Sequence, residues 1–147
     1  MRERVLRYAP QARIDGFLIA RQLRGGVEVL VGTQCDPVFG PVITVGSGGV
    51  MTELLQDVCV KLAPIDEDTA VRMLDATRVG RLLDGWRGAP AADKAALARQ
   101  VAALSRIAWA ERDRVAGIDL NPVLALPDGA YALDALIALA PTEGGPA

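Results

Sequence analysis

Residues 118–134, which read IDLNPVLALPDGAYALD, decide the fold of this chain. Two apolar runs, 118–126 and 130–138, flank the dipeptide Asp128-Gly129. Asp-Gly between alternating apolar segments is typical of a tight turn that joins antiparallel strands. The sequence therefore predicts a β-hairpin near the C-terminus.

The length of this turn decides which side chains share a face of the sheet. If Asp128-Gly129 is a two-residue turn, Pro127 pairs with Ala130 and Asp134 lies opposite Val123. A three-residue turn would invert the arrangement, because a shift of one residue moves every side chain to the other face.

Oxygen-bearing side chains lie on one face of the predicted hairpin. Asp119 and Asn121 are two residues apart in a strand, so they project together, and the two-residue turn places Asp134 diagonally across from Asn121. Carboxylate and amide oxygens suit a hard cation such as Mg²⁺, whose remaining ligands are water and phosphate oxygens. The alternative is that all three are solvated positions on an outer sheet face.

The opposite face of the hairpin is expected to pack on a long helix. Asp93 caps this helix, which ends before Gly117 and buries one stripe of apolar residues at helical spacing. The stripe consists of Leu97, Val101, Leu104 and Ala108. The strand residues expected to meet it are Ile118, Leu120, Leu124 and Leu136.

The remaining elements complete a single α+β unit with a mainly antiparallel sheet and two main helices. A second helix over 66–76 has Asp66 as its N-cap, and residues 2–9 resemble the end of a truncated helix. The loop Arg24-Gly25-Gly26 would join the first two strands. Further strands are expected at 16–22, 27–33, 41–45, 50–55 and 58–63. Residues 141–147 are expected to form a flexible tail.

Composition excludes several classes of function. The chain has 147 residues, 51% of them hydrophobic, and a formal net charge of -2. Nucleic-acid binding usually needs a basic surplus, and a membrane span needs a longer apolar run. Neither a secretory leader nor a disulfide framework is indicated, so a cytoplasmic location is expected. The absence of histidine from the sequence excludes histidine-based nucleophilic sites and phosphohistidine on this chain.

A glycine-rich stretch offers a second candidate site. Residues 46–49 (GSGG) follow an apolar run, and their N–H groups would be suited to binding phosphate. Taken alone this pattern is more typical of a simple turn. Glu28 and Glu53 are candidate carboxylates for a metal or phosphate site, or else exposed strand residues. Arg87 is a candidate anion clamp or a solvated loop residue, and Trp109 is expected in the core.

Three segments together resemble a known family. They are residues 16–64 (GFLIARQLRGGVEVLVGTQCDPVFGPVITVGSGGVMTELLQDVCVKLAP), 82–90 (LLDGWRGAP) and 118–135 (IDLNPVLALPDGAYALDA). They closely resemble the ATP-grasp domain of ADP-forming acyl-CoA synthetases and, more distantly, the nucleotide-binding subunit of succinyl-CoA synthetase. The resemblance spans about residues 10–138 and implies the C-terminal portion of an ATP-grasp fold, with 10–140 as a partial domain.

The resemblance also implies cofactors and site residues. The family converts ATP, a carboxylic acid and CoA into acyl-CoA, ADP and phosphate, so ATP and Mg²⁺ are the implied cofactors. Asn121 and Asp134 match its Mg²⁺ ligands, and Asp119 takes the acidic position of the same motif. The positions that match the nucleotide-binding loop are Gly46, Gly48, Gly49 and Glu53, and the residues that match the Asp-Pro-x-Phe-Gly-Pro turn are Asp36, Phe39, Gly40 and Pro41. No catalytic residue is assigned.

The chain departs from the family pattern in what it lacks. No segment matches the first part of the ATP-grasp domain, which carries a phosphate-binding lysine, or the CoA-binding domains. The implied partners are therefore these parts, on the same or another chain. A second copy of this chain is a further candidate partner. Residues 20–23 (ARQL) replace the usual Val-Gln-x-Met. Two functions follow: half of a synthetase site, or a non-catalytic nucleotide-binding or regulatory module, as in synthetase-like regions fused to acetyltransferases.

Overall fold

The computed structural model describes residues 1–48 and 57–141. The predicted strand 50–55 and residues 142–147 of the predicted tail 141–147 lie outside these residues. No helix in the described part is long and apolar enough to cross a membrane. The elements in chain order are α1 (Arg2–Tyr8), β1 (Val27–Asp36), β2 (Gly40–Ser47), β3 (Val58–Leu62), α3 (Glu67–Asp75), α4 (Arg78–Leu83), α5 (Lys94–Ala110), β4 (Val115–Leu126), β5 (Gly129–Ala132) and β6 (Leu136–Leu139).

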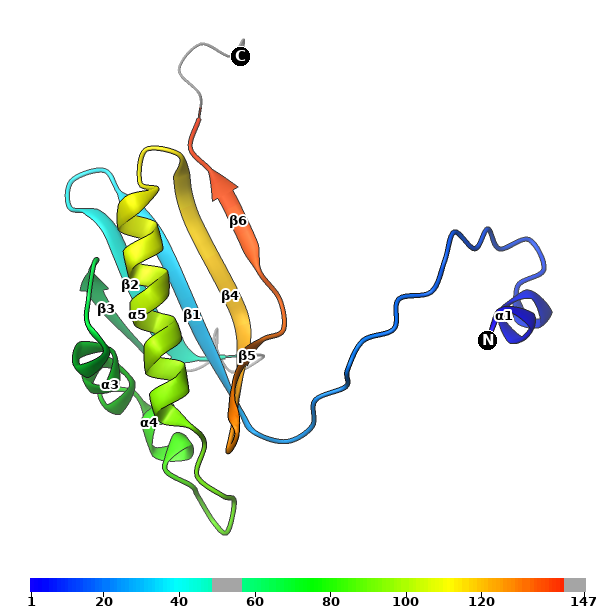
Figure 1. The fold of residues 1–147 in the computed structure, drawn as a ribbon, viewed down its shortest axis with the longest axis horizontal. Helices are drawn as coiled ribbons and strands as arrows, with labels where there is room; N and C mark the ends of the chain where they lie inside the picture. The colour runs from blue at the N-terminus through cyan, green and yellow to red at the C-terminus, as the bar shows by residue number, and fades with distance from the viewer. Residues whose placement is uncertain (49–56, 142–147) are drawn as a thin grey trace.

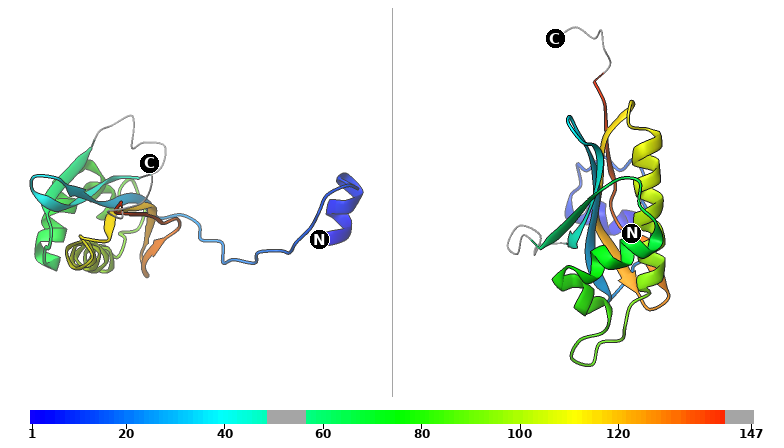
Figure 2. Two further views of the ribbon diagram at one scale, coloured as in Figure 1. Left: turned by 90° about the horizontal axis from the view of Figure 1, so that it is seen from above. Right: turned by 90° about the vertical axis from the view of Figure 1, so that its left-hand side faces the viewer.

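The six strands form one antiparallel sheet with helices against one face. The strand order is β3-β2-β1-β4-β5, and β6 also pairs with β4. Helices α3, α4 and α5 lie on the same side of the sheet, and no described helix covers the other side, here called the open face (Figures 1 and 2). The predicted α+β class is confirmed. The sequence analysis missed α4, which has Gly80 in its middle.

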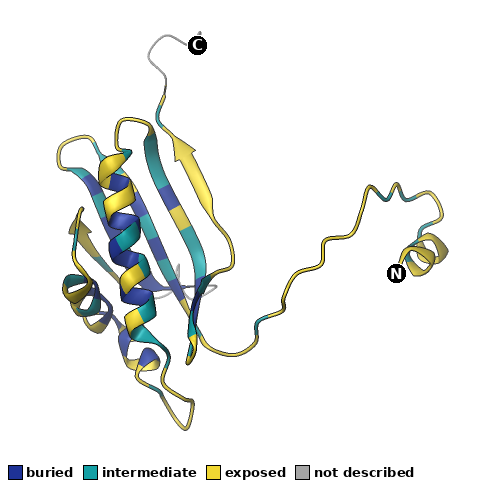
Figure 3. Ribbon diagram, viewed as in Figure 1, coloured by how far each residue is buried: buried dark blue, intermediate teal, exposed yellow. Residues whose placement is uncertain are grey.

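The core lies between the sheet and α5. Val29, Val31, Ile43 and Val45 alternate along β1 and β2 and are buried, as the two-residue period of a strand requires. The α5 stripe is buried as predicted, and it consists of Leu97, Val101, Leu104 and Ala108. Figure 3 shows that buried positions follow the strands of the sheet and one side of α5.

Both main helices begin where the sequence places them. The Asp66 carboxylate accepts a hydrogen bond from the Thr69 N–H at 2.8 Å, and the Asp93 carboxylate accepts one from the Ala96 N–H at 2.8 Å. Each bond satisfies an N–H that the first turn leaves without an intrahelical acceptor. The expectation for Trp109 was wrong, because it lies on the outer side of α5 with 46% of its surface exposed.

The predicted strand at 16–22 is absent. Residues 13–24 have no regular secondary structure, and the segment before β1 leads away from the sheet toward α1 (Figure 1). Leu18 is 95% exposed and Ile19 is 90% exposed. A strand forms only where a neighbour receives its backbone hydrogen bonds, and no described strand lies beside this segment. Gly25 and Gly26 therefore lead into β1 and do not close a hairpin.

The C-terminal hairpin exists, but its register differs from the prediction. Leu126 pairs with Gly129 and Ala125 pairs with Ala130, so the two loop residues are Pro127 and Asp128. The predicted pairing of Pro127 with Ala130 was wrong. Proline has no backbone N–H to donate to a ladder, and the strand accordingly ends at the residue before it.

A β-bulge divides β4. Val29 pairs with Val123 and Val31 pairs with Leu120, so two residues of β4 lie opposite one residue of β1. The bulge reverses the alternation along β4. Leu120 borders the core as predicted. Leu124 is buried, with 5% of its surface exposed, but it pairs with Glu28 and lies on the face of the sheet opposite α5, against the prediction.

The predicted strand 130–138 is broken into β5 and β6. In β6, Leu136 pairs with Asp119 and is 68% exposed. The prediction that Leu136 packs on α5 was therefore wrong. Because directly opposed residues share a face, Leu136 lies on the open face together with Asp119.

The N-cap of α3 predicts a specific acid sensitivity. Thr69, first through its side chain and then through its backbone N–H, lowers the pKa of Asp66 below 3.8. A lowered folded-state pKa gives stability that is present above the unfolded-state pKa and is lost as the pH falls through the folded-state pKa. The wild type should therefore lose more unfolding free energy than Asp66→Asn between pH 7 and strongly acidic pH, measured by urea denaturation. Equal losses would contradict this role of the carboxylate.

Candidate functional site

Asp119 lies on the open face in the middle of the sheet. It pairs with Gly32 of β1, and a Cβ atom added to Gly32 would lie 3.8 Å from Asp119 Oδ1. The carboxylate thus lies over the β1 backbone and is exposed to solvent. A hollow of about 310 Å³ beside it is lined in part by Gln34, Gly117 and Leu136.

Asn121 and Asp134 lie in neighbouring segments. Asn121 is half-buried at the bulge of β4, and Asp134 lies in the connection between β5 and β6. The Leu133 N–H donates to the Pro122 carbonyl oxygen at 2.9 Å, which holds this connection against the bulge. Exposed Asp134 accepts a hydrogen bond through Oδ1 from the Ala135 N–H at 2.8 Å. The two residues predicted to share a metal are thus carried by segments that lie side by side in the fold.

This donor set suits Mg²⁺ in its chemistry. Two carboxylates and one amide supply only oxygen ligands, which Mg²⁺ prefers, and Mg²⁺ usually retains several waters or phosphate oxygens. The described residues contain no cluster of three or more acidic or cysteine side chains able to hold a metal. A cation held by Asp119, Asn121 and Asp134 would therefore need ligands from water and from a phosphate. The metal-binding roles of these three residues stay predictions.

The glycine-rich stretch is shaped by close backbone packing. A Cβ atom at Gly48 would lie 2.8 Å from the backbone nitrogen of Val29, and one at Gly46 would lie 2.6 Å from the carbonyl oxygen of Asp57. Neither position has room for a side chain. Glycine is needed at both positions whether or not a phosphate binds.

Two N–H groups of this stretch already have acceptors. The Ser47 N–H donates to the Asp57 carbonyl oxygen at 3.3 Å, and the Gly48 N–H donates to the Glu28 carbonyl oxygen at 3.0 Å. A phosphate could bind the Gly48 N–H only if it replaced the Glu28 carbonyl oxygen as the hydrogen-bond acceptor. Gly49 and Glu53 lie outside the described residues, so their nucleotide-binding roles stay predictions.

Glu28 and Gly48 border a hollow at the end of the sheet. It measures about 370 Å³, and Leu82 and Trp86 also line it. Trp86 lies in the loop between α4 and α5. The neighbouring Arg87, which was the candidate anion clamp, has a left-handed backbone with φ 50° and does not line the hollow.

The turn between β1 and β2 is held by one carboxylate. Asp36 Oδ1 accepts hydrogen bonds from the N–H groups of Phe39 at 2.9 Å and Val38 at 2.8 Å. These two bonds, with that of Phe39 the stronger cause, lower the pKa of Asp36. Gly40 closes the loop with φ 77°. The Asp-Pro-x-Phe-Gly-Pro segment is therefore a structural turn.

Comparison with known proteins decides the family. The family model described as an ATP-grasp domain matches residues 1–139. This chain belongs to the ATP-grasp family. The prediction of a partial ATP-grasp fold with a mainly antiparallel sheet is confirmed.

Relatives of this ATP-grasp chain are ADP-forming CoA ligases. It is 36% identical over 123 residues to 4-hydroxybutyrate–CoA ligase [ADP-forming] of Nitrosopumilus maritimus, covering 84% of this chain and 18% of that protein. It is 37% identical over 132 residues to the beta subunit of acetate–CoA ligase [ADP-forming] I of Pyrococcus furiosus, covering 90% and 56%. The chain thus spans less than two thirds of these relatives.

Solved structures agree with this assignment. Acetyl-coenzyme A synthetase 1 of Candidatus Korarchaeum cryptofilum, in complex with coenzyme A, Ca-AMPCP and HgCl+, has a TM-score of 0.79 and 38% identity, covering 94% of this chain and 60% of that chain. The apo form of that enzyme gives a TM-score of 0.81 at 36% identity, covering 94% and 65%. A further structure of it holds coenzyme A and Mg-AMPPCP.

Proposed function

We propose that this chain supplies the C-terminal half of the ATP and Mg²⁺ site of an ADP-forming acyl-CoA synthetase. The main support is the hydrogen bond that the Leu133 N–H donates to the Pro122 carbonyl oxygen. This bond holds the segment that carries Asp134 beside the Asn121 bulge. It keeps side by side two segments that carry residues matching the metal-binding motif of the family. Relatives named as ADP-forming CoA ligases support the same activity.

The residues of the chain would position and neutralise phosphates. Mg²⁺, when bound, stabilises the negative charge that develops on the transferring phosphoryl group. Asn121 and Asp134 would hold this ion, and the exposed Asp119 carboxylate would bind it or one of its waters. Residues 46–49, which match the nucleotide-binding loop of the family, would lie beside the phosphates.

The reaction needs parts that this sequence does not match. We propose that the remaining ATP-grasp subdomain and the CoA-binding domains act with it, on the same or another chain. The exposed apolar residues of 13–24, among them Leu18 and Ile19, are suited to contact such a part, because an exposed apolar segment usually marks an interaction surface.

A direct test uses the 147-residue chain by itself. We expect it to form no acyl-CoA and to bind Mg²⁺·ATP only weakly, because it has no histidine to carry a phosphoryl group and its open face supplies one wall of a site. Calorimetric titration and a thioester assay measure both properties, with a complete ADP-forming synthetase as the positive control. Turnover by this chain alone would contradict the proposal.

A second assay separates the enzyme from a non-catalytic module. If the chain is added to an assembly that supplies the other domains, the catalytic proposal requires acyl-CoA formation that depends on its presence. Nucleotide binding without turnover in that assembly would instead favour the regulatory module.

A further inference from the structure

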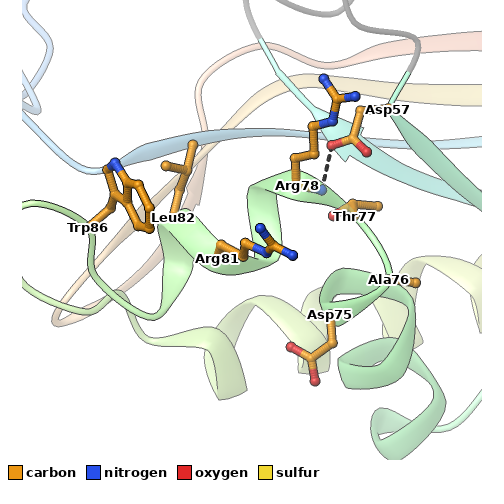
Figure 4. A pocket seen from close by; sticks show the side chains of 8 residues that line it. All are labelled: Asp57, Asp75, Ala76, Thr77, Arg78, Arg81, Leu82 and Trp86. Atoms are coloured by element: carbon orange, nitrogen blue, oxygen red, sulfur yellow. Dashed lines mark hydrogen bonds between the residues drawn. The ribbon is translucent and has the colours of Figure 1, made fainter.

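A hollow between α3 and α4 carries two arginines that the sequence analysis did not single out. It measures about 500 Å³, and Arg78, Arg81 and Trp86 line it together with Asp57 and Asp75 (Figure 4). None of the residues that line it belongs to the predicted metal site. Its position beside α3 and α4 puts it on the helix-covered side of the sheet, away from the open face.

The two acidic residues of this hollow are already engaged. Asp57 Oδ2 accepts hydrogen bonds from the Arg78 backbone N–H at 2.7 Å and from the Ser47 hydroxyl at 3.2 Å. Asp75 Oδ1 forms an ion pair with Lys94 Nζ at 2.7 Å. Lys94 Nζ also pairs with Asp84 Oδ1 at 2.6 Å. Neither Asp57 nor Asp75 is therefore bonded to one of the two guanidinium groups, although both carboxylates keep their negative charge in the hollow.

The guanidinium groups of Arg78 and Arg81 remain available. Within residues 1–48 and 57–141, no hydrogen bond or ion pair joins either guanidinium to another group. The two residues are three apart on α4, so they lie on neighbouring positions of one helix surface. In Figure 4 the Arg81 side chain lies between Arg78 and Asp75. Among the described residues, the hollow thus offers two guanidinium groups without a bonded partner, and in Figure 4 that of Arg78 lies beside Asp57.

The chemistry of these groups selects the ligand. A guanidinium group binds phosphate oxygens through two parallel N–H bonds, and each of the two arginines can make such a contact. Trp86 is 54% exposed and offers an aromatic ring beside them. Aromatic and guanidinium faces both stack on flat rings.

We propose that Arg78 and Arg81 bind a phosphate group, and that Trp86 contacts the molecule that carries it. Free phosphate and a nucleoside phosphate share this chemistry. The proposal does not depend on the metal site, because it uses none of Asp119, Asn121 or Asp134.

The test uses the fluorescence of Trp86 in the full chain. The sequence has two tryptophans, so Trp109→Phe leaves Trp86 as the only reporter. Inorganic phosphate, ADP and adenosine are titrated separately at constant ionic strength, with EDTA to remove divalent metal. We expect a saturable change with phosphate or ADP and none with adenosine. Saturation with both identifies phosphate as sufficient, whereas saturation with ADP alone identifies the nucleotide.

Variants then assign the binding to the arginines. In the Trp109→Phe background, the double variant Arg78→Gln and Arg81→Gln should raise the apparent Kd at least about 10-fold. Arg81→Lys should raise it less, because lysine keeps the positive charge. Arg99→Gln, an exposed arginine of α5, is the matched control and should bind as the parent does. Circular dichroism confirms folding of each variant.

Two results would overturn the proposal: no saturable change with phosphate or ADP, or equal affinity in the double variant. Asp134→Ala should leave this binding unchanged while it affects the metal site, so the two proposals can fail separately.

Discussion

Alanine at Asn121 or Asp134 is expected to reduce Mg²⁺-dependent phosphoryl transfer by at least about 100-fold in kcat, since each removes a direct ligand of a charge-stabilising metal. The assay needs the assembly in which the other domains are present. The measured quantity is ADP release that depends on the carboxylic acid and CoA, over a range of Mg²⁺ concentrations. A lost ligand should also raise the Mg²⁺ concentration needed for half-maximal rate.

Folding should be unaffected by these two substitutions. Asp134 is exposed and Asn121 only half-buried, and neither belongs to the apolar core, so we expect the free energy of unfolding to fall by about 1 kcal/mol or less. Asp128→Ala, in the exposed turn of the same hairpin, is the matched control and should retain activity. Full activity in both Asn121→Ala and Asp134→Ala would contradict the proposal that these residues bind the metal.

Leu97→Ala is expected to produce the largest loss of stability. Leu97 is fully buried in α5 against the sheet, and truncation of a buried leucine removes apolar contacts and leaves a cavity, which together cost about 2–5 kcal/mol. Urea denaturation of the two proteins measures the difference in the free energy of unfolding.

Ile107→Ala is the control on the same helix. Its side chain is 49% exposed, so the loss should be about 1 kcal/mol or less. Because alanine has a higher helix propensity than either residue, a loss of stability at Leu97 that exceeds the loss at Ile107 reports burial and not helix propensity. Equal losses at the two positions would contradict the packing of α5 on the sheet through Leu97.

Local patterns predicted the two main helices, α3 and α5, but not the short α4. The stripe from Leu97 to Ala108 repeats at helical spacing, and the caps Asp66 and Asp93 act within the first turn of their own helices. Such signals depend on residues three or four positions apart, so the sequence contains all that they need. The strands of β1, β2 and β3 follow the same logic at a spacing of two.

Predictions failed where distant segments decide the outcome. Residues 16–22 have the composition of a strand but no neighbour to pair with in the described structure. Leu124 has the alternation of a core residue, but the bulge at Asn121-Pro122 turns it to the open face. Pairing partners and bulges are properties of two strands together, and one strand's sequence does not specify them.

The candidate site divides in the same way. The sequence by itself determined which side chains carry oxygen ligands and where the glycine-rich stretch lies. It also determined the family motifs in which these residues occur. Only the tertiary structure decided that the connection holding Asp134 lies against the Asn121 bulge, that Gly46 and Gly48 are needed for backbone packing, and that Arg78 and Arg81 meet Trp86 at one hollow. The reason is physical: residue chemistry is local, whereas a site is made by hydrogen bonds and packing between segments far apart in the chain.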